Sequence, residues 1–213
     1  MIINTSDPSR LSIMHFPIRG DLGVYQGVNA ERLWVNTNYL PATDTPCRPQ
    51  LPWLFFVRET LETCISISDV ETMLQTYDRD TGVALTVIDG KTNEAEIFEC
   101  SRSTYRRVPA IEQTLYATNH AQSKYMQGTF QSPTSGSLRR LARLKELVTQ
   151  HMPYRLEDMI HILSDPDIEQ REEWSGTIQA LIACPSYRKF WFATGYYPAA
   201  SQGRFISISW PWK

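Results

Sequence analysis

The chain has 213 residues, of which 42% are hydrophobic and 11% aromatic, a composition typical of an ordinary globular domain or domain pair that excludes disorder. With 21 Lys and Arg against 23 Asp and Glu, the net charge of −2 provides no general attraction to nucleic acid or to an anionic membrane. The sequence contains no apolar run of membrane-spanning length, and residues 1–10 lack the pattern of a secretory signal. We therefore expect a cytoplasmic protein with neither nucleic acid nor membrane as a partner.

Four cysteines are scattered along the chain, at positions 47, 64, 100 and 184. They form no CxxC pair and have no histidine at ligand spacing, so we predict no metal site, no cofactor and no disulfide framework. Cys64 and Cys100 lie within apolar patterns, which favours small buried side chains. None of the four precedes a helix beside a histidine, so a papain-like nucleophile is not indicated.

The first third of the chain predicts antiparallel strands followed by two helices. Runs rich in β-branched and aromatic residues predict strands at 11–16, 23–28 and 32–37. After a proline-rich stretch, apolar spacing predicts helices at 53–64 and 69–77. Ser68 or Asp69 is the expected N-cap of the second helix, because side-chain oxygens there precede the apolar spacing.

Strands and helices alternate in groups through the rest of the chain. Asp89-Gly90 lies between two alternating runs, which predicts a β-hairpin. The expected strands are 83–89, 94–100, 104–108, 114–118, 176–184, 188–193 and 203–209, and the expected helices are 137–150 and 156–163. Because the strands come in runs, the order favours the α+β class with antiparallel sheets. A helix pair after each strand group suits a layered αββα sandwich.

Three features have residue types that could carry chemistry, and each has a second interpretation. The basic cluster Arg139, Arg140, Arg143 and Lys145 could bind phosphate, but it also suits the solvated face of an amphipathic helix. His120 could be a base or a hydrogen-bonded structural residue at a strand end. Asn38 and Asn119 are amides near strand ends, able to donate to an oxyanion or to form turns.

Six segments, in order from about residue 20 to residue 208, resemble the motifs of one protein family. They are Gly27-Val28-Asn29-Ala30 through Asn38-Tyr39-Leu40, Arg58-Glu59-Thr60-Leu61-Glu62, Val87-Ile88-Asp89-Gly90 with Ile97-Phe98-Glu99, Tyr116-Ala117-Thr118-Asn119-His120, Ser137-Leu138-Arg139-Arg140-Leu141, and 177–195. In these segments the chain is similar to the acyl-CoA:6-aminopenicillanic acid acyltransferase family, the C45 peptidases. That family is related to choloylglycine hydrolases and acid amidases.

The resemblance implies an N-terminal-nucleophile (Ntn) hydrolase fold, αββα, with catalysis at acyl amides or acyl thioesters. In such a family a cysteine becomes the first residue after autoproteolysis, and its α-amine serves as the base. Asn119 matches the family's oxyanion asparagine, and Asn38 matches a second donor. Arg140 matches the arginine of the helix start, implying that it holds carboxylates or orients the nucleophile, although Arg139 is an alternative match.

The sequence departs from this family at the nucleophile. The cysteine, with an Arg and an Asp soon after it, is expected before Gly27, yet residues 1–46 contain no cysteine and Cys47 follows the matching segment. We therefore expect a single Ntn-hydrolase-like domain over 1–213 that lacks its first segment, through truncation or natural loss. Two functions follow, an enzyme fragment inactive as it stands or a non-catalytic binding or interaction protein. A second copy of the chain or a complementing N-terminal fragment is the expected protein partner.

Overall fold

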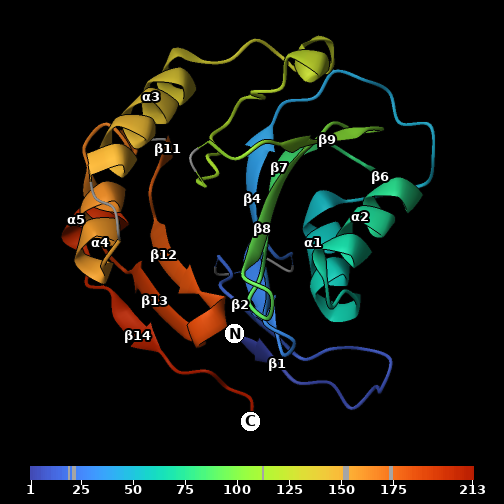
Figure 1. Ribbon diagram of the computed structural model, residues 1–213, viewed down its shortest axis with the longest axis horizontal. Helices are drawn as coiled ribbons and strands as arrows, with labels where there is room; N and C mark the ends of the chain where they lie inside the picture. Colours follow the sequence, from blue (N-terminus) through green and yellow to red (C-terminus); the bar gives the residue numbers. More distant parts are fainter. Residues whose placement is uncertain (19, 21–22, 112, 151–153, 173–174) are drawn as a thin grey trace. The chain divides into compact units, whose positions relative to one another are not determined.

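The computed structural model describes residues 1–18, 20, 23–111, 113–150, 154–172 and 175–213. The chain divides into two compact units, the first made of Met1–Thr134 with Pro211–Lys213 and the second of Ser135–Trp210. Each unit places helices on an antiparallel sheet (Figure 1). The expectation of one domain over residues 1–213 stays a prediction.

The first unit contains a seven-stranded sheet in the order β1-β2-β3-β4-β7-β8-β9, in which every neighbouring pair is antiparallel. Its strands are β1 (Ile2–Ile3), β2 (Ile13–His15), β3 (Gln26–Asn29), β4 (Leu33–Leu40), β7 (Gly82–Asp89), β8 (Glu94–Cys100) and β9 (Tyr105–Val108). Two short strands that the sequence pattern did not predict, β5 (Gln50–Leu51) and β6 (Asp78–Arg79), form a parallel pair. The long strands fall where alternation predicted them.

The predicted hairpin joins β7 to β8, with Asp89 opposite Glu94. Asp89 closes the turn, because its carboxylate accepts a hydrogen bond from the backbone N–H of Lys91 at 2.8 Å. Asn93 takes a positive φ of 62°, a conformation that Asn tolerates better than most residues. The expected strand at 114–118 is wrong, since only an isolated bridge pairs Ile111 with Thr114.

Helices α1 (Trp53–Thr63) and α2 (Ile67–Thr76) cover one face of this sheet (Figure 1). Their apolar stripes pack onto strand residues such as Leu33, Val35 and Leu85. Ser66, not Ser68 or Asp69, caps α2, because its hydroxyl accepts the N–H of Asp69 at 3.2 Å. The helix begins two residues earlier than apolar spacing alone predicts, since Ile67 is itself buried. A short 3-10 helix, η1 (Lys124–Thr129), follows β9.

Among its described residues the second unit contains the sheet β12-β13-β14 and the helices α3, α4 and α5. Its elements are α3 (Ser135–Gln150), α4 (Leu156–Ser164), β10 (Arg171–Glu172), β11 (Ser175–Gly176), β12 (Gln179–Cys184), η2 (Pro185–Tyr187), β13 (Lys189–Thr194), α5 (Ala199–Gln202) and β14 (Ile206–Ile208). Small side chains let α5 approach the sheet, with Ala180, Ala193 and Ala200 in one buried cluster. Both predicted helices are present, and the predicted α+β class with antiparallel sheets is confirmed.

Candidate active site

Strand β4 places Asn38 on the sheet face that α1 and α2 do not cover. Leu33 and Val35 belong to the cluster against the helices, whereas Leu40 belongs to a second cluster with Ala84 and Ile97. Because side chains alternate along a strand, Asn38 shares the face of Leu40. Asn38 lies inside the strand opposite Ala84 and is half-buried, so the turn interpretation is wrong for this residue.

Asn119 reaches the same end of β4. Its side-chain nitrogen donates a hydrogen bond to the carbonyl oxygen of Tyr39, the residue after Asn38, at 3.1 Å. The two amides singled out by the sequence therefore lie on neighbouring parts of one unit, although many residues separate them in the chain. An amide NH₂ has two donor hydrogens, so the bond to Tyr39 orients the group and is compatible with a second bond.

The segment around Asn119 is fastened by a buried acid. Glu99, on β8, is 1% exposed and accepts backbone N–H bonds from Gln122 and, at 2.9 Å, from Ser123. Burial raises the pKa of Glu99, and the two backbone donors oppose that rise. The side chain of Gln122 also donates to the carbonyl of Tyr116 at 2.6 Å, which occupies a backbone group that a strand partner would use.

Glu99 lies within the motif segment Ile97-Phe98-Glu99, for which the resemblance implies no catalytic role. The signal was present, because an acid within the apolar run Ile97-Phe98-Glu99-Cys100 is unusual for a strand that is buried there. His120 contacts Thr118, whose hydroxyl lies 3.1 Å from Nδ1 of the ring. That contact accords with the structural interpretation of His120.

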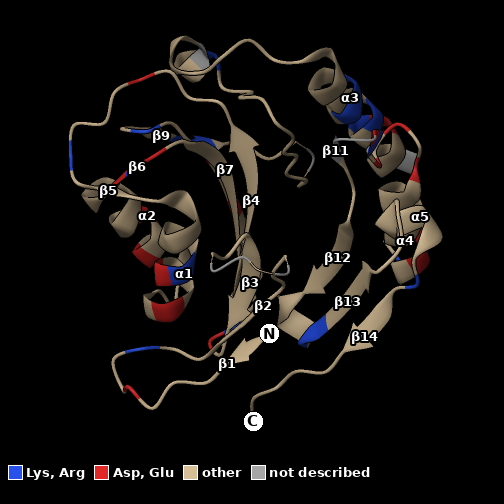
Figure 2. Cartoon of the chain, turned by 180° about the vertical axis from the view of Figure 1, so that it is seen from behind, with Lys and Arg blue, Asp and Glu red and all other residues tan. Residues whose placement is uncertain are grey.

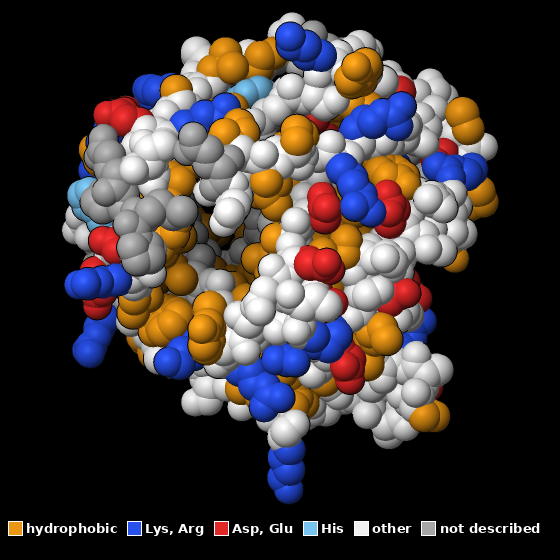
Figure 3. Space-filling model, viewed as in Figure 1, with side chains coloured by type: hydrophobic (Ala, Val, Ile, Leu, Met, Phe, Trp, Pro, Cys, Tyr) orange, Lys and Arg blue, Asp and Glu red, His pale blue; other side chains and the backbone are white. Residues whose placement is uncertain are grey.

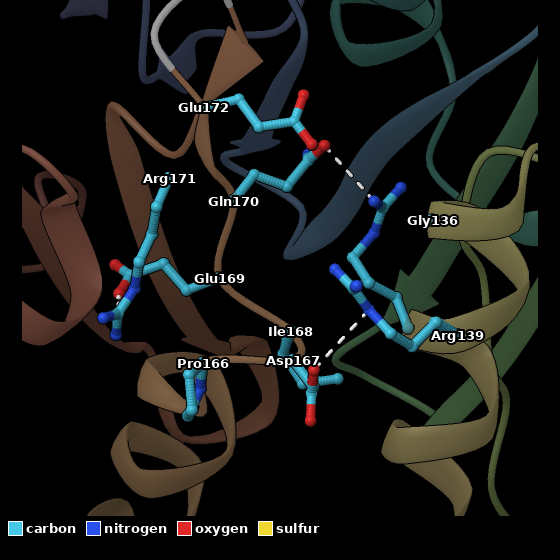
Figure 4. Close-up of a pocket in the computed structure, with 10 residues that line it drawn as sticks. Gly136, Arg139, Pro166, Asp167, Ile168, Glu169, Gln170, Arg171 and Glu172 are labelled. Atoms are coloured by element: carbon cyan, nitrogen blue, oxygen red, sulfur yellow. Dashed lines mark hydrogen bonds and ion pairs between the residues drawn. The ribbon is translucent and has the colours of Figure 1, made fainter.

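Arg140 lies on α3, in the second unit, beside a pocket of about 230 Å³ (Figure 4). Its Nη1 donates to Oε1 of Gln170 at 3.2 Å. Burial lowers the pKa of Arg140, and the neighbouring charge of Arg139 adds to the effect. Arg139 is much more open, with 65% of its side chain exposed and an ion pair of 3.5 Å to Asp167. Of the two alternative arginines, Arg140 is the more enclosed.

Arg143, further along α3, makes ion pairs within its own unit. Arg143 contacts Asp165 at 2.7 Å and Glu146 at 2.9 Å. The Asp165 side chain is nearly buried, so this pair ties α3 to the end of α4. On the face of the molecule shown in Figure 3, basic and acidic side chains are interspersed. This arrangement supports the interpretation of α3 as carrying a charged, paired helix face.

Two of the four cysteines lie away from the amides. Cys64 and Cys100 belong to the cluster between the sheet and α1 and α2, on the face opposite Asn38. Burial raises the pKa of Cys64 to about 11 and that of Cys100 to about 12, so both stay protonated at neutral pH. Cys47 is exposed, and its backbone N–H is held by the carboxylate of Asp78.

Neither a metal site nor a membrane span is evident in the part of the chain that the structure describes. No group of three or more His, Cys, Asp and Glu side chains there is arranged to hold a metal ion. No helix within those residues is both long and apolar enough to cross a membrane.

The model of one protein family, acyl-coenzyme A:6-aminopenicillanic acid acyl-transferase, matches residues 5–197. The chain belongs to this family. No curated protein matches the chain significantly. The site residues Asn38, Asn119 and Arg140 stay predictions, because family membership does not assign their roles in this chain.

Solved structures from three organisms share the fold. A variant of conjugated bile acid hydrolase from Clostridium perfringens aligns with a TM-score of 0.64 and 12% identity, covering 93% of this chain and 77% of that one. Penicillin V acylase from Agrobacterium tumefaciens aligns with a TM-score of 0.66 and 10% identity, covering 93% and 69%. A Caenorhabditis elegans ortholog of N-acylethanolamine-hydrolyzing acid amidase aligns with a TM-score of 0.56 and 16% identity, covering 92% and 81%. The predicted Ntn-hydrolase-like fold is confirmed.

Proposed function

We propose that the protein takes part in the hydrolysis or transfer of acyl groups at amide bonds. Family membership over residues 5–197 supports this proposal. The similar structures are named for hydrolysis of a bile acid conjugate, penicillin V or an N-acylethanolamine. These names share an acyl group as the part that is released, so an acyl amide or acyl thioester is the substrate class that we assign.

In this proposal Asn119 and Asn38 bind the acyl carbonyl oxygen. The observation that carries it is the bond from Asn119 to the Tyr39 carbonyl, which brings one amide beside the strand position of the other. Donors fixed before the reaction stabilise a developing oxyanion more than mobile donors do. In an active site of this kind, removing one such donor raises the barrier by about 2.7–4 kcal/mol.

We assign Arg140 an orienting role, in which its guanidinium holds a carboxylate. Its enclosure beside Gln170 supports the choice of Arg140 over the more exposed Arg139. Arginine suits this role because its planar donors match a carboxylate bidentately.

We also propose that none of the chain's own cysteines attacks the substrate. Cys64 and Cys100 are buried with raised pKa values and lie on the opposite sheet face, so neither supplies a thiolate beside the amides. The sulfur of Cys47 contacts the carbonyl of Thr45, which cannot accept its proton as a base. Cys184 lies on β12, far along the chain from the position before Gly27 at which the family's nucleophile is expected. The 213 residues therefore supply the acyl-binding side of the site and no turnover by themselves.

Two measurements test the proposed acyl binding and the proposed lack of turnover separately. Penicillin V, a conjugated bile acid and an N-acylethanolamine are each titrated into the protein by calorimetry, and amine release is followed by mass spectrometry. We expect saturable binding of at least one probe, weakened about tenfold in Asn119→Ala because a hydrogen bond is lost. Gln131→Ala, which alters an exposed amide of the same unit, is the control and should bind normally.

Two outcomes would contradict this proposal. If no probe binds, the acyl-amide assignment is wrong. If amine is released and iodoacetamide blocks the release, one of the four cysteines is a nucleophile and the assignment of inactivity is wrong.

A non-catalytic binding protein is the second candidate, and the burial of Cys64 and Cys100 favours it. The two candidates differ in what accompanies the chain in its native source. An enzyme part predicts a co-purifying polypeptide with an N-terminal cysteine, detectable by mass spectrometry, that restores amine release. A binding protein predicts probe binding as the final step, with no restoring partner.

A further inference from the structure

Three residues form a row across the strands on the face that α1 and α2 leave uncovered. Asn38 on β4 lies opposite Ala84 on β7, and Ala84 lies opposite Glu99 on β8. Residues directly opposite each other in antiparallel strands share a face. Neighbouring strands are about 4.8 Å apart, so the backbones at Asn38 and Glu99 are separated by about 10 Å, with only the methyl group of Ala84 between them.

Glu99 is a buried carboxylate that binds backbone donors. Its two oxygens each accept one N–H, Oε1 from Gln122 and Oε2 from Ser123. Across β9 its neighbour is Arg106, but the Arg106 guanidinium is exposed and donates to the carbonyl of Tyr105. Among the described residues Glu99 makes no ion pair, so the two backbone donors are what offset the desolvation of its charge.

The two ends of one short segment are thus fastened to this row. Asn119 is bound at Tyr39, beside Asn38, and Gln122 and Ser123 are bound at Glu99. Between them, Ala121 packs against the cluster that contains Ala84, which is small enough to leave room for backbone above it. The segment has little freedom to rotate Asn119 away from β4 while both ends hold.

We propose that Glu99 is a positioning residue for acyl transfer, a buried carboxylate that holds residues 119–123 so that the Asn119 amide stays beside Asn38. The inference rests on the proposed function, because it gives the fixed amide its purpose. A carboxylate suits this task because it offers an acceptor to each of two adjacent N–H groups. A glutamine of the same size would turn an NH₂ group toward one of those donors and lose one bond.

Glu99→Gln is the direct test, and Asp78→Asn is the matched control. Asp78 is also fully buried and accepts backbone N–H bonds, from Cys47 and Arg48, in a different segment of the same unit. Amide hydrogen exchange is measured at Gln122 and Ser123, and the side-chain signal of Asn119 is followed by ¹⁵N NMR after assignment with Asn119→Ala. We expect exchange roughly ten- to a hundredfold faster in Glu99→Gln, a shift of the Asn119 signal, and neither change in Asp78→Asn.

A second variant keeps the test decisive if Glu99→Gln does not fold. Ser123 has a φ of −69°, which proline adopts, so Ser123→Pro deletes the N–H that Glu99 binds with no change of that angle. The Asn119 signal should shift in the same direction. Unchanged Asn119 signals in the folded variants would overturn the proposal.

Titration with penicillin V separates this inference from the proposed function. If the unchanged protein binds the probe, Glu99→Gln should bind it about tenfold more weakly and Asp78→Asn should bind it normally. If the unchanged protein binds no probe, the proposed function fails. The exchange rates and the Asn119 signal still decide whether Glu99 positions that amide.

Discussion

The two faces of the seven-stranded sheet are built from the same strands but carry different kinds of side chain. The face under α1 and α2 is nearly continuous apolar surface, formed by residues such as Val35, Leu85 and Phe98. The other face carries Asn38 and Glu99 among apolar side chains and is covered in part by the 3-10 helix η1 and the segment before it. The first face stabilises the fold by burying apolar side chains. The second face holds polar groups that bind a segment without regular structure.

The helix-covered face has polar exceptions, and they differ from each other. Asn29 is fully buried, and its amide donates to the carbonyls of Leu61 and Cys64 and accepts the N–H of Leu33. His15 is 3% exposed, and neither ring nitrogen has a hydrogen-bond partner among the residues that the structure describes. A buried polar group costs free energy unless it is bonded, so these two residues should respond to change in opposite ways. Charged residues are found on α1 (Figure 2), where Arg58 and Glu62 form an ion pair of 2.8 Å.

The largest effect is expected from the apolar face. Phe98 is fully buried and packs edge to face on Tyr105, with ring centroids 5.8 Å apart. Phe98→Ala should lower the free energy of unfolding by about 3–5 kcal/mol, because it removes an aromatic ring and leaves a cavity. Urea unfolding measures this change. Tyr125→Ala, at a side chain that is 90% exposed, should change the free energy of unfolding by less than about 0.5 kcal/mol. Equal losses in Phe98→Ala and Tyr125→Ala would contradict the expectation that burial on the apolar face stabilises the fold.

The next effect concerns pH. Burial lowers the pKa of His15 to about 4, and the charges of the Met1 amine and Arg58 add to it. In the unfolded chain the pKa of histidine is about 6.5, so unfolding takes up a proton between these values. Stability should therefore fall by up to about 3 kcal/mol as the pH drops from 6.5 to 4, and this loss should level off below pH 4.

Unfolding curves of the unchanged protein and His15→Leu, recorded across that range, check this expectation. In His15→Leu the free energy of unfolding should lack the fall that His15 causes between pH 6.5 and pH 4. The pKa values of Asp44 and Asp78 also lie below their ordinary values. Burial acts to raise each pKa, but hydrogen bonds outweigh this effect, mainly from Ser103 to Asp44 and from Arg48 to Asp78. Their contribution is present above the unfolded pKa and is lost only at more acid pH. Parallel curves for the two proteins would show that His15 is not the cause.

Loss of the satisfied amide should cost less. Asn29→Ala leaves two carbonyls and one N–H without their partner, so we expect a loss of about 1–3 kcal/mol in the free energy of unfolding. Asn36→Ala, on the other face and half-buried, is the matched control, with an expected loss below about 1 kcal/mol. If both variants lose the same amount, the two faces do not differ in the way that their bonds suggest.

A smaller effect is expected at the start of α2. Ser66→Ala removes the hydroxyl that accepts the Asp69 N–H and should cost about 1 kcal/mol. Ser68 is exposed and does not cap the helix, so Ser68→Ala should be nearly neutral. Thermal unfolding of the two variants distinguishes these positions, and the reverse order of stabilities would restore Ser68 as the cap.

The smallest effect on stability is expected at Asn38, on the polar face. Because Asn38 is half-buried, Asn38→Ala should change the free energy of unfolding by less than about 0.5 kcal/mol. The same variant should weaken binding of an acyl-amide probe such as penicillin V about tenfold. A large loss of stability with unchanged binding would assign Asn38 to the framework instead of the site.

Local pattern was enough to predict most of the framework. Alternation located β7 and β8, and the Asp89-Gly90 turn located their connection, because strand period and turn chemistry are properties of adjacent residues. The pattern failed at 114–118, where the structure has an isolated bridge between Ile111 and Thr114 and the Tyr116 carbonyl accepts a hydrogen bond from the Gln122 side chain. It also failed at Ser66, because the burial of Ile67 against the core extends α2 by two residues.

The candidate site was likewise predicted only in part from the sequence. Motif resemblance identified Asn38, Asn119 and Arg140, but it offered no partner for any of them. Tyr39 and Glu99, which hold the Asn119 segment in place, are distant from it in the chain and carried no assigned role.

The amino-acid sequence by itself determined the family and the strand and helix periods, and it predicted two amides, Asn38 and Asn119, for the acyl carbonyl. Only the tertiary structure decided which face of the sheet carries Asn38 and which buried acid holds the segment of Asn119. The physical reason is that period and propensity act over a few residues. The row from Asn38 through Ala84 to Glu99 instead depends on the register of three strands, which is set by long-range pairing.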